Sequence, residues 1–146
     1  MEMMTPELYA QTTYFQNYRT EGWGEPCSMA KRLVFGADKL RALAGVPCIV
    51  HCGFEGRDRG YHPKGMAFDF HLVGIPLLQQ FYLALQIPEF TGIGVYPNWN
   101  NKGLHCDVRE LNGMPRTIWI AKYVYQNNKR IQKYERLDNI YKLVYL

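Results

Sequence analysis

The chain has 146 residues, of which 47% are hydrophobic and 21% charged, and its 17 basic and 13 acidic side chains give a formal net charge of +4. This length fits one domain with its own core over residues 1–146, and the composition excludes a disordered or collagen-like chain. No apolar run approaches the roughly 20 residues of a membrane span. The basic residues are dispersed, so we expect no nucleic-acid partner.

The first part of the chain predicts an irregular segment followed by a helix and a strand. Residues 1–26 are polar and aromatic and should wrap around the domain. Apolar side chains then recur at three- and four-residue spacing over residues 28–44, with Ser28 as the N-cap and Gly45 at the C-terminal end. An apolar strand is expected over residues 47–54.

The middle of the chain alternates between strands and a helix. A second strand is expected over residues 65–73, and a helix should begin after Pro76 and end before Pro88. Residues 92–96 and 104–109 resemble paired strands joined by a loop rich in Asn and Gly.

The C-terminal part gives one ambiguous segment and one helix. Residues 117–125 fit a strand or a helix equally well, whereas the apolar spacing over residues 129–145 predicts an amphipathic helix. The chain as a whole therefore predicts a single α+β domain with a central antiparallel sheet and flanking helices. The five tyrosines of the last 24 residues are expected to pack in the core rather than form a carbohydrate-stacking surface (Tyr123, Tyr125, Tyr134, Tyr141 and Tyr145).

Four cysteines are too few for a disulfide scaffold, and residues 1–6 lack the basic and apolar segments of a secretory signal. We therefore expect synthesis in the cytoplasm and cysteines that are small, buried, apolar thiols kept reduced. Strand alternation would place His51 on the face opposite Cys48 and Cys52, which disfavours a metal site within this strand. His51 is accordingly expected to be structural.

Three residues from separate segments carry the chemistry. Asp69 should point to one face of its strand, and His105 and Asp107 should share a face of another. A turn at Gly65 can fold His62 back towards Asp69. If the two strands are neighbours, His62, Asp69 and His105 point at one spot.

Two imidazoles and a carboxylate suit Zn²⁺ with a fourth position left for water. Zinc lowers the pKa of that water to about 7 and polarises a carbonyl. On spacing alone, ordinary hydrogen-bonded histidines are the competing interpretation. His71, on the face of Asp69, would be one ligand too many and is expected to be a supporting or surface residue.

The order of three motifs resembles that of the M15 zinc peptidases. These motifs are His-x-x-Gly-x-Ala-x-Asp, Gly-Ile-Gly-x-Tyr-Pro and His-x-Asp-x-Arg, at residues 62–69, 92–97 and 105–109. The family includes D-Ala-D-Ala carboxypeptidases, murein endopeptidases and phage endolysins, and shares its fold with the hedgehog signalling domain. The resemblance covers roughly residues 28–120. It implies that fold, Zn²⁺ ligands at His62, Asp69 and His105, and peptidoglycan stem peptides or cross-bridges as substrates.

Asp107 and Arg109 match the rest of the last motif. Asp107 either orients a zinc ligand or accepts a proton from the water, and the sequence leaves both roles open. Tyr96 and Trp99, beside the expected site, either line a substrate groove or pack the hairpin.

The chain also departs from the family pattern. The family has Ser where this chain has Gly60, and Gly-Tyr-Arg where this chain has Glu55 as the third residue. Arg57 or Arg59 would then take over the role of that arginine, with solvated loop charges as the alternative. Many relatives place an acidic base where this chain has Lys102.

The sequence therefore predicts a zinc-dependent peptidase that hydrolyses peptidoglycan peptides through metal-activated water. Its expected place of action is the cell wall, either after lysis or as a virion component. The alternatives are a non-catalytic zinc-containing module of the same fold and a metal-free structural protein. The oligomeric state has no signal in the sequence.

Overall fold

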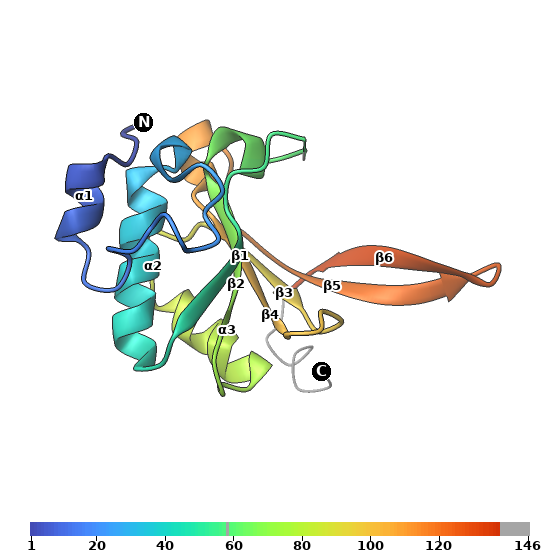
Figure 1. Ribbon diagram of the computed structural model, residues 1–146. Coiled ribbons are helices and arrows are strands. Elements are labelled where there is room, and N and C mark those ends of the chain that lie inside the picture. The colour runs from blue at the N-terminus through green and yellow to red at the C-terminus, as the bar shows by residue number, and fades with distance from the viewer. Residues whose placement is uncertain (58, 138–146) are drawn as a thin grey trace.

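The computed structural model describes residues 1–57 and 59–137, and within them six strands form one sheet in the order β1-β2-β4-β3-β5-β6. The strands are β1 (Cys48–Cys52), β2 (Ala67–Leu72), β3 (Gly92–Tyr96), β4 (Gly103–Asp107), β5 (Thr117–Gln126) and β6 (Lys129–Arg136). The α-helices are α1 (Pro6–Gln11), α2 (Lys31–Ala44) and α3 (Leu77–Leu85), and the 3-10 helices are η1 (Pro26–Ser28), η2 (His62–Lys64) and η3 (Arg109–Asn112). Figure 1 shows the three α-helices on one side of the sheet. The predicted α+β class with a single domain is confirmed.

The sheet is mixed, so the expectation of an entirely antiparallel sheet is wrong. β3 and β5 pair in parallel, while the other neighbouring pairs are antiparallel. The connection through η3 carries the chain from the end of β4 past the start of β3, which lets β5 join the free edge of β3 in the same direction. The finer hedgehog-like assignment stays a prediction.

Helix α2 carries the predicted apolar stripe but begins three residues after Ser28. Leu33, Val34 and Leu40 are fully buried against the core, and Gly45 closes the helix in the left-handed conformation with a φ of 69°. The expected N-cap at Ser28 is wrong because its hydroxyl bonds Glu25 within η1.

The N-terminal segment contributes to the core. Thr5 caps α1 by accepting a hydrogen bond from the backbone N–H of Leu8, with Pro6 at the first helical position. Tyr9 and Trp23 are fully buried, and the Tyr9 hydroxyl donates to the Pro26 carbonyl at 2.7 Å. The short helix was missed because six residues carry too little periodicity to be distinguished from a loop.

Alternation along β2 separates the core from the functional face. Phe68 and Phe70 are fully buried under the helices and stack on each other, whereas Asp69 between them points to the opposite face. Gln80 of α3 is buried and fixes the nearby chain: its amide accepts from the N–H of Leu72 and donates to the carbonyl of Lys102. These bonds tie the end of β2 to the start of β4.

The hairpin β5–β6 corrects the prediction of a C-terminal helix over residues 129–145. Lys129–Arg136 pairs residue by residue with β5, and only residues 117–120 of β5 also pair with β3. The hairpin therefore extends beyond the sheet (Figure 1). Its two-residue turn, Asn127 and Asn128, has φ values of 51° and 63°, the primed-turn geometry that asparagine tolerates. Residues 138–145 of the expected helix lie outside the described residues.

The four cysteines are free, but the expectation that all are buried is wrong: Cys106 is buried, Cys48 and Cys52 are half-buried, and Cys27 is exposed. None of the helices among the described residues has the length and apolar character required to cross a bilayer.

Candidate metal centre

A β-bulge brings the end of β1 onto the face of Asp69. The pairing of β1 with β2 shifts between Val50, which faces Phe70, and Cys52, which faces Asp69. The extra residue, His51, therefore does not lie on the face opposite Cys52. Its Nε2 lies 2.6 Å from Nδ1 of His71, and both His51 and Asp69 line one groove. The alternation predicted for this strand is wrong for this reason, whereas the structural role expected of His51 stays a prediction.

Asp69 and His105 face each other across the antiparallel pair β2–β4. Nδ1 of His105 lies 3.0 Å from Oδ1 of Asp69, and Nε2 of His62 lies 3.4 Å from the same oxygen. The structure thus brings the three predicted side chains together. Their role as zinc ligands stays a prediction.

His62 is positioned by a tight turn that requires glycine at its end. Gly65 has a φ of 67°, and a Cβ atom there would lie 1.7 Å from the Ser28 carbonyl oxygen. Nδ1 of His62 lies 2.8 Å from the carbonyl oxygen of Gly53. Because a carbonyl can only accept, Nδ1 donates and Nε2 is left to face Asp69.

His105 is oriented by a buried carboxylate and an arginine. Its Nε2 donates to Oδ2 of Asp107 at 2.8 Å, and Asp107 is fully buried. Arg109 donates two hydrogen bonds to that carboxylate, from Nε at 2.9 Å and from Nη2 at 2.7 Å. The guanidinium also lies over the rings of Trp119 and Tyr61, at 4.7 and 5.1 Å from their centroids. Of the two roles left open by the sequence, this geometry favours the orientation of His105.

Two glycines of β3 leave room for this network. A Cβ atom at Gly92 would lie 2.1 Å from Oδ1 of Asp107, and one at Gly94 would lie 2.5 Å from the indole of Trp119. That indole lies 5.3 Å from the ring of His105. Glycine is therefore required at both positions of the Gly-Ile-Gly segment, because a larger side chain would collide with Asp107 or Trp119.

The pKa values of the two histidines and of Asp69 are shifted in opposite directions, so that each group favours its charged form. Although burial favours neutral rings, the bond to Asp69 raises the pKa of His62, and bonds to Asp107 and Asp69 raise that of His105. Burial would raise the pKa of Asp69, but its contacts with both rings outweigh it and lower this pKa to about 2. Each ring must therefore release a proton before its nitrogen facing Asp69 can bind a cation.

The two distances from Oδ1 of Asp69 to the imidazole nitrogens are close to the distances between zinc ligands. Bonds of about 2.0–2.1 Å place tetrahedral ligand atoms roughly 3.3–3.4 Å apart, and the two contacts to Asp69 measure 3.4 and 3.0 Å. In addition, the second nitrogen of each ring donates to a fixed acceptor, as metal-binding histidines usually do.

A second possible ligand set replaces His105 with Cys52. Within the described residues, donor atoms of Cys52, His62 and Asp69 lie within 4.8 Å of one another and could hold a metal ion. Sγ of Cys52 lies 3.6 Å from Nδ1 of His62, the nitrogen that bonds Gly53 and not the one facing Asp69. The two possible ligand sets therefore share His62 and Asp69 and differ in whether Cys52 or His105 is the third residue. The sequence missed Cys52 because the bulge that turns it inward leaves no mark in the apolar pattern.

Comparison with known proteins identifies no family for this chain. No protein-family model, curated protein or solved structure matches this chain. The resemblance to M15 peptidases consequently depends on the motif residues and on the geometry that they adopt.

The loop arginines of the predicted catalytic set are exposed. Arg57 has a side chain 95% exposed, with its Nε 3.6 Å from Glu55, and Arg59 is exposed in the same loop. The contacts found for Arg57 do not join it to the His–Asp cluster, so the substrate role expected of these two residues stays a prediction.

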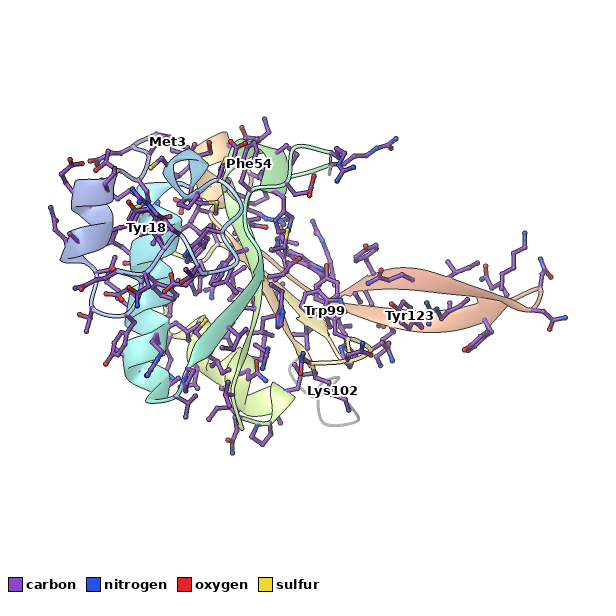
Figure 2. The ribbon with its side chains drawn as sticks, in the orientation of Figure 1. Met3, Tyr18, Phe54, Trp99, Lys102 and Tyr123 are labelled. Atoms are coloured by element: carbon purple, nitrogen blue, oxygen red, sulfur yellow. The ribbon has the colours of Figure 1, made fainter. Side chains whose placement is uncertain are left out.

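A groove of about 570 Å³ begins at Asp69. Trp99 lines it, whereas Tyr96 stacks on Trp99 and accepts a hydrogen bond from Trp119. Tyr96 therefore packs within the hairpin, and contact of Trp99 with a substrate stays a prediction. Figure 2 shows Trp99 beside the base of the hairpin and Tyr123 on the hairpin itself.

The expectation that the C-terminal tyrosines pack in the core is wrong for the hairpin. Tyr123 lines the groove, and Tyr125 and Tyr134 are 76% and 65% exposed, because the hairpin has no helix packed on it. Tyr141 and Tyr145 lie outside the described residues.

Proposed function

We propose that this protein is a zinc-dependent peptidase that acts on peptidoglycan peptides. The observation that carries the proposal is the meeting of His62 Nε2 and His105 Nδ1 at one oxygen of Asp69. The groove that opens from Asp69 supports a catalytic rather than a purely structural site, because a substrate can reach this residue. The wall peptide as substrate rests on the motif resemblance.

Each residue has a defined task in this proposal. His62, Asp69 and His105 hold the metal, which when bound supplies Lewis-acid activation of water and of the scissile carbonyl. Asp107 keeps His105 in the tautomer that presents Nδ1, and Arg109 holds Asp107. Trp99 and the neighbouring asparagines line the path of the substrate.

Digestion of purified peptidoglycan tests the proposal. The protein should release new amino termini from wall peptides, lose this activity with a chelator and regain it with Zn²⁺. His62→Ala should be inactive, whereas Lys64→Ala, in the same 3-10 helix but outside the cluster, should remain active. Failure to cut any wall chemotype with zinc bound would contradict the peptidase assignment. In the same proposal the protein acts at the wall after lysis or as a virion component.

A zinc-containing module without turnover is the second candidate. It is favoured by the full engagement of Asp107, whose two oxygens are occupied by His105 and Arg109 and are poorly placed to accept a proton. It is also favoured by Lys102, which is exposed where many M15 peptidases carry an acid. Stoichiometric zinc together with intact peptidoglycan in the digestion above would support this candidate.

A further inference from the structure

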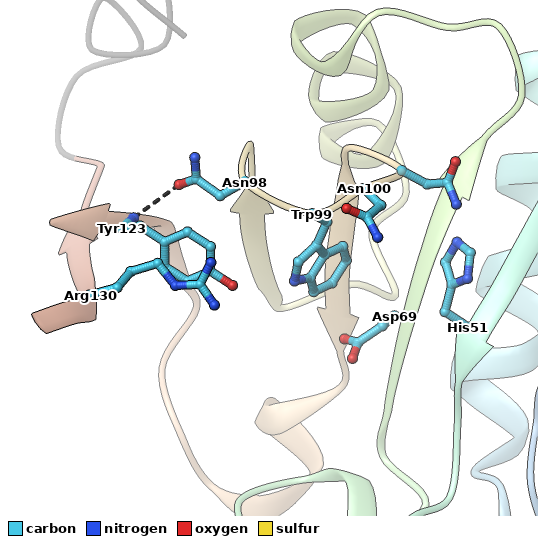
Figure 3. Close-up of a pocket in the computed structure, with 8 residues that line it drawn as sticks. His51, Asp69, Asn98, Trp99, Asn100, Tyr123 and Arg130 are labelled. Carbon is cyan, nitrogen blue, oxygen red and sulfur yellow. Dashed lines mark hydrogen bonds between the residues drawn. The ribbon is translucent and has the colours of Figure 1, made fainter.

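The groove beside Asp69 has walls from two separate parts of the chain. One wall is the loop between β3 and β4, with Asn98, Trp99, Asn100 and Asn101, and the other is the hairpin, with Tyr123 and Arg130 (Figure 3). His51 and Asp69 lie at the sheet end of this groove. Any substrate that reaches Asp69 by this path passes between the loop and the hairpin.

The register of the hairpin assigns Arg130 to the face of the candidate metal centre. Arg130 pairs with Tyr125. Because side chains alternate along a strand, Tyr125 lies on the same face as Tyr123, Ala121 and Trp119, and Arg130 shares this face. Trp119 lies 5.3 Å from His105, so this face continues that of the site. Lys129, the residue before Arg130, has its side chain on the opposite face.

The side chain of Arg130 packs on a neighbouring aromatic ring. Its guanidinium lies over the ring of Tyr123 at 4.3 Å from the centroid. The N–H of Tyr123 donates in turn to Oδ1 of Asn98 at 2.9 Å, which ties the hairpin to the opposite wall (Figure 3). A guanidinium held in this way loses little conformational entropy on binding a planar anion.

The groove carries charged groups of opposite sign, Arg130 on the hairpin and Asp69 on the sheet. Arg130 provides a permanent cation at the hairpin end, and the amides of three asparagines line the groove together with Asp69 (Asn98, Asn100 and Asn101). Amide side chains can accept and donate hydrogen bonds along a peptide backbone, and an arginine fork matches a carboxylate with two parallel bonds.

We propose that Arg130 forms a carboxylate subsite, so that the groove selects peptides carrying a carboxylate on the hairpin side of the bond at Asp69. This inference rests on the proposed function for the nature of the substrate. The carboxylate belongs either to the C-terminus of a stem peptide or to the α-carboxyl group of a γ-linked D-Glu residue.

Calorimetric titration of peptide pairs tests the subsite on protein stripped of metal, in which binding is separated from cleavage. The first pair is diacetyl-L-Lys-D-Ala-D-Ala and its C-terminal amide, and the second is L-Ala-γ-D-Glu-L-Lys with the α-carboxyl group free or amidated, each with an amidated C-terminus. The wild type should prefer the acid in one pair by about 10–100-fold in Kd, and the pair that shows the preference identifies the carboxylate.

Matched variants on the hairpin complete the experiment. Arg130→Gln should abolish the preference, whereas Lys129→Gln, with the same loss of charge on the opposite face, should retain it. Equal binding of acid and amide in both pairs, no binding of any peptide, or an unchanged preference in Arg130→Gln would overturn the subsite. These results are independent of whether the metal-loaded protein cuts wall peptides, so failure of the subsite and failure of the peptidase proposal are distinguishable.

Discussion

Replacing Asp107 with Asn exchanges one carboxylate oxygen for an amide nitrogen and so tests whether Asp107 orients the ring of His105. Oδ1 of Asp107 accepts two hydrogen bonds from Arg109, from Nε and from the backbone N–H, whereas Oδ2 accepts one from Arg109 and one from His105. The side-chain oxygen of Asn should therefore take the place of Oδ1, and its amide nitrogen that of Oδ2 opposite Nε2 of His105. Nε2 must then accept, which moves the ring proton to Nδ1, the nitrogen that lies 3.0 Å from Asp69. The variant keeps the volume of the side chain while presenting the wrong tautomer to a metal ion.

The expected loss has two components. Removing an outer-shell carboxylate lowers metal affinity about 10–100-fold, or about 1.4–2.7 kcal/mol. For folding, burial would raise the pKa of Asp107, but its bonds to Arg109 and His105 lower it from 3.8 to about 2. At neutral pH this shift corresponds to about 2–3 kcal/mol of stability, and thus to a melting temperature lower by roughly 5–10 °C in the variant.

The pH dependence has a definite sign. Because the folded-state pKa of Asp107 lies below its unfolded value, the stabilisation is complete above 3.8 and disappears as the pH falls towards 2. The difference in melting temperature between wild type and Asp107→Asn should therefore shrink across this interval.

Zinc competition against a chromophoric chelator, with thermal melts of the same samples, measures both components. Asp38→Asn is the matched control, because Asp38 accepts from the backbone N–H groups of Thr13 and Tyr14 on the helical side of the molecule. It should lower stability without changing zinc affinity. Zinc affinity of Asp107→Asn equal to that of the wild type would refute the proposed role of Asp107.

Three further predictions concern the ligands and their support. In Co²⁺-substituted protein, Cys52→Ser should leave the absorption spectrum unchanged and His105→Ala should abolish it, whereas a thiolate charge-transfer band lost in Cys52→Ser would make the cysteine a ligand. Gly94→Ala should lower the free energy of unfolding by about 1–3 kcal/mol and should also lower zinc affinity, because its Cβ would lie 2.5 Å from Trp119. Gly56→Ala, where the added Cβ would have contacts no closer than 3.8 Å, is the control in the same melts and titrations. Because the pKa values of both histidines are raised, zinc binding at pH 7 should release about two protons, measured by calorimetry in buffers of different ionisation enthalpy, and no release would contradict the charged network.

The strands that carry Asp69 and His105 were predictable because alternation with a period of two fixes the face of each side chain. Once the two strands pair, the register alone places these residues opposite each other. The position of Cys52 was not predictable in this way, because one bulged residue reverses the alternation and depends on contacts with β2.

The hairpin shows a different limit. Ile131 and Tyr134 are three residues apart, a spacing typical of a helix, yet they lie on opposite faces of a strand. The overlooked signal was the Asn127-Asn128 pair, which favours a two-residue turn and would have predicted the pairing. Arg130 was missed as a groove residue for the same reason.

Metal analysis of the purified protein tests the central claim most directly. After equilibration with Zn²⁺ and removal of unbound metal, the wild type should retain about one zinc ion per chain, and His62→Ala should retain none although it remains folded. Absence of bound metal from the wild type, or full occupancy in His62→Ala, would contradict a zinc centre at His62, Asp69 and His105.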